Sequence, residues 1–269
     1  MERVFILAAS SLREQWRNRA WQVAMLFAGV MLYFSVLLGI LAADQELRAL
    51  LDFGLSFIEL MALAAAIFGA ATGVLREMET KSIYLILSRP VSRLEYLLGR
   101  YLGLVLSMLA AVSLMAGAHL ILLLLRGWSF RADYLLALYG IALKVAVAAA
   151  VATFFALFST SSLSALVITG VLWTLGHFIA EMRFLAARGG LSLVPLAALI
   201  QLVPNLQLFN FRDRLDIPAS AAAGHSVAGH SVAGHLVAGH PVALATAYAA
   251  VYCACCLALA YALIRRKDF

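Results

Sequence analysis

The chain alternates long apolar runs with short polar connections. Six of these runs carry few charges and approach or exceed the length that crosses the roughly 30 Å hydrocarbon core of a bilayer as a helix. They are residues 21–43, 54–75, 101–125, 134–158, 163–185 and 242–264. The pattern predicts an all-α polytopic membrane protein, one transmembrane domain over residues 1–269 with six transmembrane helices.

Two further segments contain many apolar residues but are not predicted to cross the membrane. Residues 1–19 mix hydrophobic positions with four arginines, which suits a helix lying in the membrane interface, although an ordinary cytoplasmic lead-in fits equally well. Within the connection 186–241, the apolar run 191–211 is interrupted by Pro195 and Pro204. A seventh span there would place the basic tail outside, so we predict a re-entrant external hairpin before the last span.

The segment 76–100 has the strongest local helix signals. Residues 77–87 suit a short helix, and Pro90 disfavours helical geometry at Arg89 and removes a donor. A new helix begins directly afterwards, because Ser92 and Glu95 form the S-x-x-E pattern of a capping box. From Ser92 to residue 125 the helix would be longer than the bilayer core, so its first turns should lie in the cytoplasm or along the interface.

Composition and charge support this topology. With 64% hydrophobic and 13% charged residues, the chain is too apolar for a soluble domain. The N-terminal segment, the 76–100 loop and the tail carry four, five and three basic residues, against seven in the other loops. The positive-inside rule therefore puts both termini in the cytoplasm. The net charge is +6, and the basic residues that produce it flank the membrane spans. We therefore expect contact with membrane lipids and none with nucleic acid.

Charges inside the spans are the main candidates for a site. Lys144 is the one ionised residue near the middle of the fourth span, and Glu59 in the second span is its candidate partner. Both would line a transport pathway; a buried ion pair or a snorkelling lysine is the alternative. His177 is a third pathway candidate, although a hydrogen bond to Glu181 within its own helix is an alternative.

A five-residue repeat near the last span contains four histidines. It reads AGHSV AGHSV AGHLV AGHPV, with the imidazoles at His225, His230, His235 and His240. Such a tract can gather a soft or borderline metal ion in a flexible loop, but a tandem duplication in a tolerant external loop is the preferred explanation, so no metal site is assigned. The chain has no phosphate-binding loop, no zinc-protease motif and no nucleophile turn, and we therefore expect no enzymatic site of its own.

The amino-acid sequence of the charged loop resembles the coupling region of the ABC-2 type exporter permeases. It reads REME at 76–79, IYLILSRPVSR at 83–93 and EYLLGR at 95–100; VPN at 203–205 and the basic ending RRKDF are also similar to that family. Within that family, the chain resembles the group that contains the permease of a copper-processing transporter. The resemblance implies that the partner ATPase is contacted through Glu77, Glu79, Lys81, Tyr84, Arg89, Pro90 and Arg93.

The same resemblance implies a bacterial cytoplasmic (inner) membrane permease that forms a homodimer and couples to two ABC ATPase subunits. ATP and magnesium would be bound by those subunits, and this chain would bind no cofactor. We expect an exporter of a hydrophobic or lipid-linked substrate. The alternatives are a metal (copper) transporter that uses the histidine repeat, and a membrane anchor or signalling subunit that transports nothing.

Overall fold

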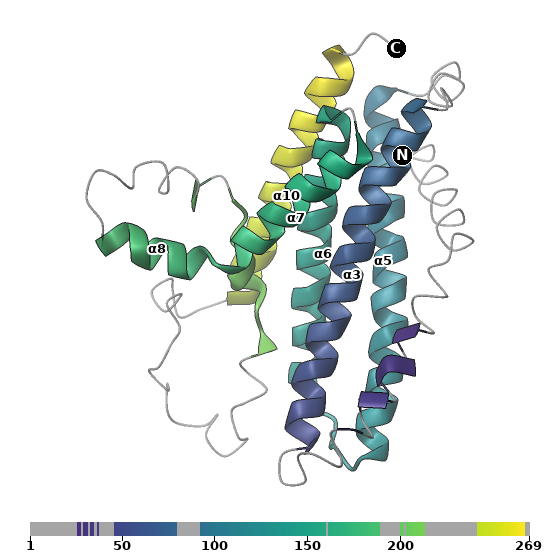
Figure 1. Ribbon diagram of the computed structural model, residues 1–269, viewed down its shortest axis with the longest axis vertical. Coiled ribbons are helices and arrows are strands. Elements are labelled where there is room, and N and C mark those ends of the chain that lie inside the picture. Colours follow the sequence, from purple (N-terminus) through teal and green to yellow (C-terminus); the bar gives the residue numbers. More distant parts are fainter. Residues whose placement is uncertain are drawn as a thin grey trace.

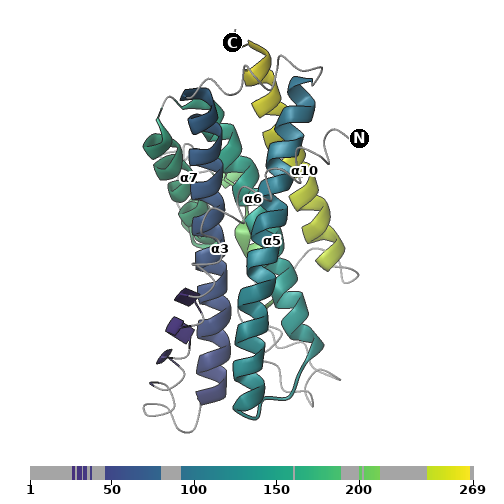
Figure 2. The ribbon, with the colours of Figure 1, turned by 90° about the vertical axis from the view of Figure 1, so that its right-hand side faces the viewer.

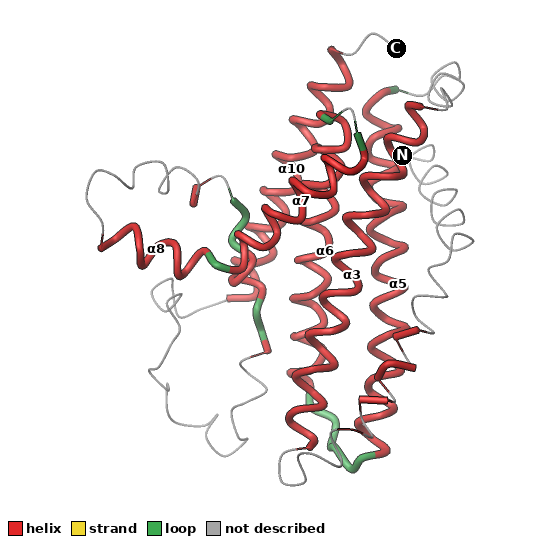
Figure 3. The backbone as a smooth tube through the Cα atoms, viewed as in Figure 1, coloured by secondary structure: helices red, strands yellow, loops and turns green. Residues whose placement is uncertain are grey.

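The computed structural model describes residues 26–27, 29–31, 33–34, 37, 46–79, 92–159, 161–188, 200–201, 203–212 and 241–266. These residues form helices joined by short connections and contain no strand (Figure 3), so the predicted all-α fold is confirmed. Four helices are long and apolar enough to cross a membrane, and a bent pair makes a fifth candidate. They are α3 (Glu46–Glu79), α5 (Arg93–Leu125), α6 (Ala132–Phe158) and α10 (Pro241–Arg266).

Several predicted features lie outside the described residues. They include the interfacial segment 1–19, most of the first span 21–43, the coupling positions Lys81, Tyr84, Arg89 and Pro90, and the histidines of the repeat. The described positions between 26 and 37 are helical, and Phe27 and Met31 among them are buried in the core. The count of six spans therefore stays a prediction.

Helix α6 is the centre of the bundle. It contacts α3, α5, α7 (Ser162–His177) and α10. Its middle, residues 145–152, reads VAVAAAVA and is almost entirely buried. Small side chains let neighbouring helices approach closely, which explains why this helix lies inside. Figures 1 and 2 show α3, α5 and α6 running side by side, with α7 and α10 beside only one half of their length.

The capping box predicted at the start of α5 is confirmed. The Ser92 hydroxyl accepts from the Glu95 amide at 3.2 Å, and the Ser92 amide donates to the Glu95 carboxylate at 2.8 Å. The helix then continues for 33 residues, about 50 Å. Helix α3 is similarly long, and it runs without a break to Glu79, so residues 77–79 are the end of the second span and not the start of a separate helix.

The predicted span over 163–185 is bent, so whether it crosses the membrane as one span stays a prediction. The helix breaks at Phe178, and α8 (Ile179–Arg188) is bent by 67° from α7. The side chain of Gln207 donates to the His177 carbonyl at 2.6 Å, which occupies an oxygen that a continuous helix would use. Helix α7 alone has 16 residues, about 24 Å, and is shorter than the hydrocarbon core.

The described part of the predicted hairpin packs on the bundle. Val203, the 3-10 helix η3 (Leu206–Phe209) and Phe211 bury apolar side chains, with η3 in contact with α6, α7 and α8. The segment comes so close to α6 that a Cβ atom at Gly140 would lie 2.2 Å from the Phe209 carbonyl oxygen. A glycine at this position therefore sets the distance between η3 and α6. The rest of residues 186–241 lies mostly outside the described part.

A buried histidine joins the three long helices. His119 on α5 is fully buried; its Nδ1 lies 3.0 Å from the Tyr134 hydroxyl of α6 and its Nε2 3.3 Å from the Leu50 carbonyl of α3. The ring passes so close to α3 that a Cβ at Gly54 would lie 2.0 Å from Nε2. The ring is held from both sides, so it has no room to move away.

We predict that Gly54→Ala destabilises the bundle by about 1–3 kcal/mol, because the added methyl group forces apart α3 and the fixed imidazole. The measurement is the free energy of unfolding in mixed micelles. Gly117→Ala is the matched control, since Gly117 is also helical and a Cβ atom added there would have no neighbouring atom within 4 Å. Equal stability of the two variants would contradict the role assigned to Gly54.

Candidate functional site

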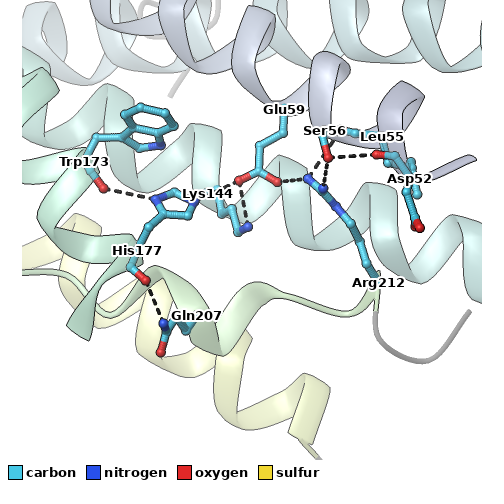
Figure 4. A network of polar contacts seen from close by, with 9 residues as sticks. All are labelled: Asp52, Leu55, Ser56, Glu59, Lys144, Trp173, His177, Gln207 and Arg212. Carbon is cyan, nitrogen blue, oxygen red and sulfur yellow. Dashed lines mark hydrogen bonds and ion pairs between the residues drawn. The ribbon is translucent and has the colours of Figure 1, made fainter. Parts of the chain in front are cut away.

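Four elements bring charged side chains together halfway along the bundle (Figure 4). Glu59 comes from α3, Lys144 from α6, His177 from the last residue of α7 and Arg212 from the segment after η3. Lys144 Nζ lies 2.7 Å and His177 Nε2 3.1 Å from Glu59 Oε1. Arg212 donates to the other carboxylate oxygen. One carboxylate thus holds three basic groups, and we call these four residues the charged cluster.

The charged cluster is buried in a region otherwise made of apolar helix. Glu59 is 5% and Lys144 3% exposed, and each lies near the middle of its candidate span. A charge at membrane depth needs a partner or a watery cavity, and both residues have a partner of opposite sign. Removing one member of such a pair leaves an uncompensated buried charge, so the cluster should respond strongly to substitution.

Sequence reasoning brought Glu59, Lys144 and His177 forward but missed Arg212. Arg212 lies 153 residues after Glu59, directly after the interrupted apolar run 191–211, so no local pattern links the two. Its guanidinium donates to Ser56 Oγ at 2.5 Å and to the Leu55 carbonyl at 3.4 Å as well as to Glu59. The backbone contact and the two side-chain contacts fix the position of this cation against α3.

The suggested hydrogen bond between His177 and Glu181 does not form. The bend at Phe178 turns α8 away, and Glu181 instead accepts from Gln207 at 3.4 Å. His177 Nδ1 lies 3.1 Å from the Trp173 carbonyl, while Nε2 faces the Glu59 carboxylate. A carbonyl and a carboxylate oxygen both accept hydrogen bonds, so each ring nitrogen of His177 faces an acceptor.

A cavity of about 430 Å³ lies against the charged cluster. Its lining includes all four charged residues together with Ser56, Leu60, Trp173, Gln207 and Asn210. Ser56, Leu60 and Asn210 are exposed, whereas Glu59 and Lys144 are buried. The cavity therefore extends from the surface of the bundle to the buried ion pair, and its volume lies within the range of small-molecule sites in proteins.

Comparison with known proteins gives the family. The model of a family described as ABC-2 family transporter protein matches residues 40–262, which is most of the chain and includes every element of the charged cluster. The chain belongs to the ABC-2 transporter family. No curated protein matches the sequence.

Membership of the ABC-2 family makes this chain a multi-pass membrane protein and a permease subunit of an ABC transporter, a kind of subunit that generally works with an ABC ATPase. The family match does not reach the copper-processing group, which stays a prediction. Among the described residues, no set of three metal-ligating side chains comes together. The histidine repeat lies outside them.

The end of the ABC-2 bundle that carries the predicted coupling loop contains a second polar cluster. Glu77 on α3 pairs with Arg100 on α5 at 2.6 Å and accepts from the Tyr96 hydroxyl. Arg93 donates to the carbonyls of Ile264 and Arg265 at 2.9 and 3.0 Å, at the last turn of α10. These contacts tie α3 to α5 and α5 to α10, and Figure 1 shows the three helix ends together. We call these residues the loop-end cluster.

The two coupling residues whose contacts are described, Glu77 and Arg93, are thus bonded within the subunit. Glu79 ends α3, and the contacts of its side chain are not described. An internal bond does not exclude a role in coupling, since a residue that ties helix ends together transmits a movement of the loop to the bundle. The direct docking of a partner ATPase on these residues stays a prediction.

Proposed function

We propose that this chain is the transmembrane subunit of an ATP-driven exporter. It pairs with a second copy of itself and with two separate ATPase subunits, and it moves a hydrophobic or lipid-linked substrate across the cytoplasmic membrane. The observation that carries the proposal is the cavity with its charged cluster, buried at mid-span in a family whose members are transporter proteins. A protein that only anchored a partner would have no need of buried charge at that depth.

Helix α3 supports the coupling part of this proposal. It carries Glu59 in the charged cluster and Glu77 in the loop-end cluster, 18 residues or about 27 Å apart on one unbroken helix. A push on the loop that follows α3 would therefore move Glu59 relative to Lys144 and Arg212, which belong to other elements. With the basic loop end in the cytoplasm, the partner ATPase would act from that side.

The docking part is tested by charge reversal in the loop. We predict that Glu79→Lys combined with Lys81→Glu abolishes recovery of an ABC ATPase when the chain is affinity-purified from its native membranes in mild detergent. Glu77 is kept in this variant because it bonds inside the subunit. Electrostatic complementarity at an interface is lost when charges are exchanged, even though the net charge is unchanged.

The matched control is Glu181→Lys combined with Arg183→Glu on α8, which has the same two-residue spacing and exposed side chains. It should retain the ATPase. Loss of the ATPase in both variants would point to a damaged fold and not to docking. If neither the parent nor either variant recovers an ABC ATPase, the exporter proposal fails and the anchor or signalling alternative takes its place.

A further inference from the structure

The described residues that line the cavity include more basic than acidic side chains. Glu59 is the only acidic side chain among them, and it faces Lys144, Arg212 and His177. Burying cations in a region of low dielectric is unfavourable unless negative charge balances them. A second oxyanion in this cavity would bring the set close to neutrality, whereas a cationic ligand would add to the imbalance.

A hydrogen-bond donor in the same cavity has no acceptor. Trp173 Nε1 is buried and has no hydrogen-bond partner among the described residues. The indole ring lies beside the imidazole of His177, with ring centroids 5.0 Å apart, and Trp173 lines the cavity. Buried polar groups in proteins are nearly always paired, and this N–H has almost no accessible surface, so an acceptor group in the cavity would reach it only after a shift of the indole ring.

The surface beside the cavity is apolar. Leu60 at its edge is 47% exposed and belongs to a stripe on α3 that continues through Ala64 to Phe68, which is 60% exposed. Residues four apart share one face of a helix, so the stripe starts at the cavity and runs along the bundle. In a membrane-spanning helix, such a stripe provides a dry surface for a hydrocarbon chain.

We infer that the cavity binds the oxyanion head group, a carboxylate or a phosphate, of a single-chain amphiphile. Arg212 contacts the head group, Trp173 lines the cavity beside it, and Lys144 balances its charge. The hydrocarbon tail lies on the α3 stripe of Leu60, Ala64 and Phe68. This inference rests on the proposed exporter function, whose substrate it specifies.

Glu59 has a particular part in this site. Its carboxylate accepts from all three basic groups, so their spacing suits a group as large as a carboxylate. A head group of that kind must compete with Glu59 for Arg212. A planar guanidinium donates to two oxygens at once, so Arg212 can pass from Glu59 and Ser56 to the head group without losing both bonds. Removing the Glu59 charge should therefore strengthen anion binding, in contrast to removal of Arg212.

The test measures binding by the purified full chain in a neutral maltoside detergent. Trp16, Trp21 and Trp128 are replaced by Phe, so that Trp173 alone reports by its fluorescence. Dodecyl phosphate and dodecanoate are the anionic probes, and dodecyltrimethylammonium is the cationic probe of equal chain length. We expect a saturable change with at least one anionic probe, and the tighter of the two identifies the head-group chemistry.

Three variants then decide the inference. Arg212→Gln should raise the dissociation constant of the anionic probe by at least about tenfold, because one partner of a buried charge pair is lost. Glu59→Gln should lower it, and Arg183→Gln, an exposed arginine on α8, should leave it unchanged. Arg212→Lys keeps the positive charge but loses the planar guanidinium that donates two parallel hydrogen bonds, so it should also bind the anionic probe more weakly. This variant provides the test if Arg212→Gln fails to fold.

The inference is overturned by saturable binding of the cationic probe with similar affinity, by no binding of either anion, or by an unchanged dissociation constant in the Arg212 variants. None of these measurements involves an ATPase. Failure here therefore leaves the exporter proposal standing, while failure to recover an ATPase leaves the binding site intact.

Discussion

Glu59→Gln is expected to lower the free energy of unfolding by about 3–5 kcal/mol, more than any single change among its three basic partners. The carboxylate is bonded by Lys144, His177 and Arg212, so its removal leaves the buried Lys144 and two partly buried basic groups without their shared partner. The measurement is unfolding in mixed micelles of neutral and denaturing detergent, followed by loss of helical circular dichroism.

Lys144→Met is the comparison that makes this prediction specific. The methionine side chain has a similar length, and Glu59 keeps Arg212 and His177, so loss of the Lys144–Glu59 hydrogen bond should cost about 1.5–3 kcal/mol. The double variant should be no less stable than Glu59→Gln alone, because the unpaired lysine is then absent. If Lys144→Met lowers the free energy of unfolding as much as Glu59→Gln or more, the Glu59 carboxylate is not the group that holds the three basic residues together.

The same variants separate a structural role from one in transport. In the assembled transporter, Lys144→Met is expected to change substrate-dependent ATPase turnover even where the protein is produced in normal amounts. Lys144 lines the cavity, and its charge balances what binds there. Unchanged turnover at unchanged abundance would leave Lys144 as part of a buried ion pair only.

What the sequence predicted well has local causes. The start of α5 at Ser92 and Arg93 follows from a capping box whose donors and acceptors lie within three residues. The pairing of Glu59 with Lys144 was predictable because ionised residues are rare and unfavourable in the middle of a membrane span, so two of opposite sign are expected to pair. In both cases, the residue types alone indicate the interaction, so it can be predicted without knowledge of the fold.

The failures have causes far away in the chain. At the break at Phe178, the freed His177 carbonyl is bonded by Gln207, 30 residues later in the chain. Arg212 follows the segment around η3, whose close approach to α6 requires a glycine at position 140. Neither residue has a neighbour in sequence that signals its role. The apolar pattern also could not separate α7 from α8, since a bend leaves the hydropathy unchanged.

The predicted coupling residues show a different limit of sequence reasoning. A charged loop between apolar spans indicates contacts outside the bilayer, but it does not distinguish contacts with a partner from contacts within the subunit. Glu77 and Arg93 both bond other helices of the same chain. Substitution of such a residue weakens docking indirectly, so a loss of binding would be misread as a contact with the ATPase.

Glu77→Lys is therefore expected to destabilise the subunit itself, by about 3 kcal/mol, and not only to weaken its binding to a partner. The pair with Arg100 is mostly buried, with side-chain exposures of 17% and 14%, and the new lysine would face Arg100 at close range. Tyr96 would also lose the carboxylate to which its hydroxyl donates. Unfolding of the isolated chain in mixed micelles measures the effect.

The change Glu77→Lys combined with Arg100→Glu tests this reasoning, because the exchanged charges restore the attraction between α3 and α5. It should recover most of the lost stability. If it recovers ATPase capture as well, Glu77 acts by holding the helix ends in place. If stability returns while capture does not, the carboxylate itself contacts the partner, and the loop-end cluster is part of the docking surface after all. A stability of Glu77→Lys equal to that of the parent would remove the structural role and leave the docking role alone.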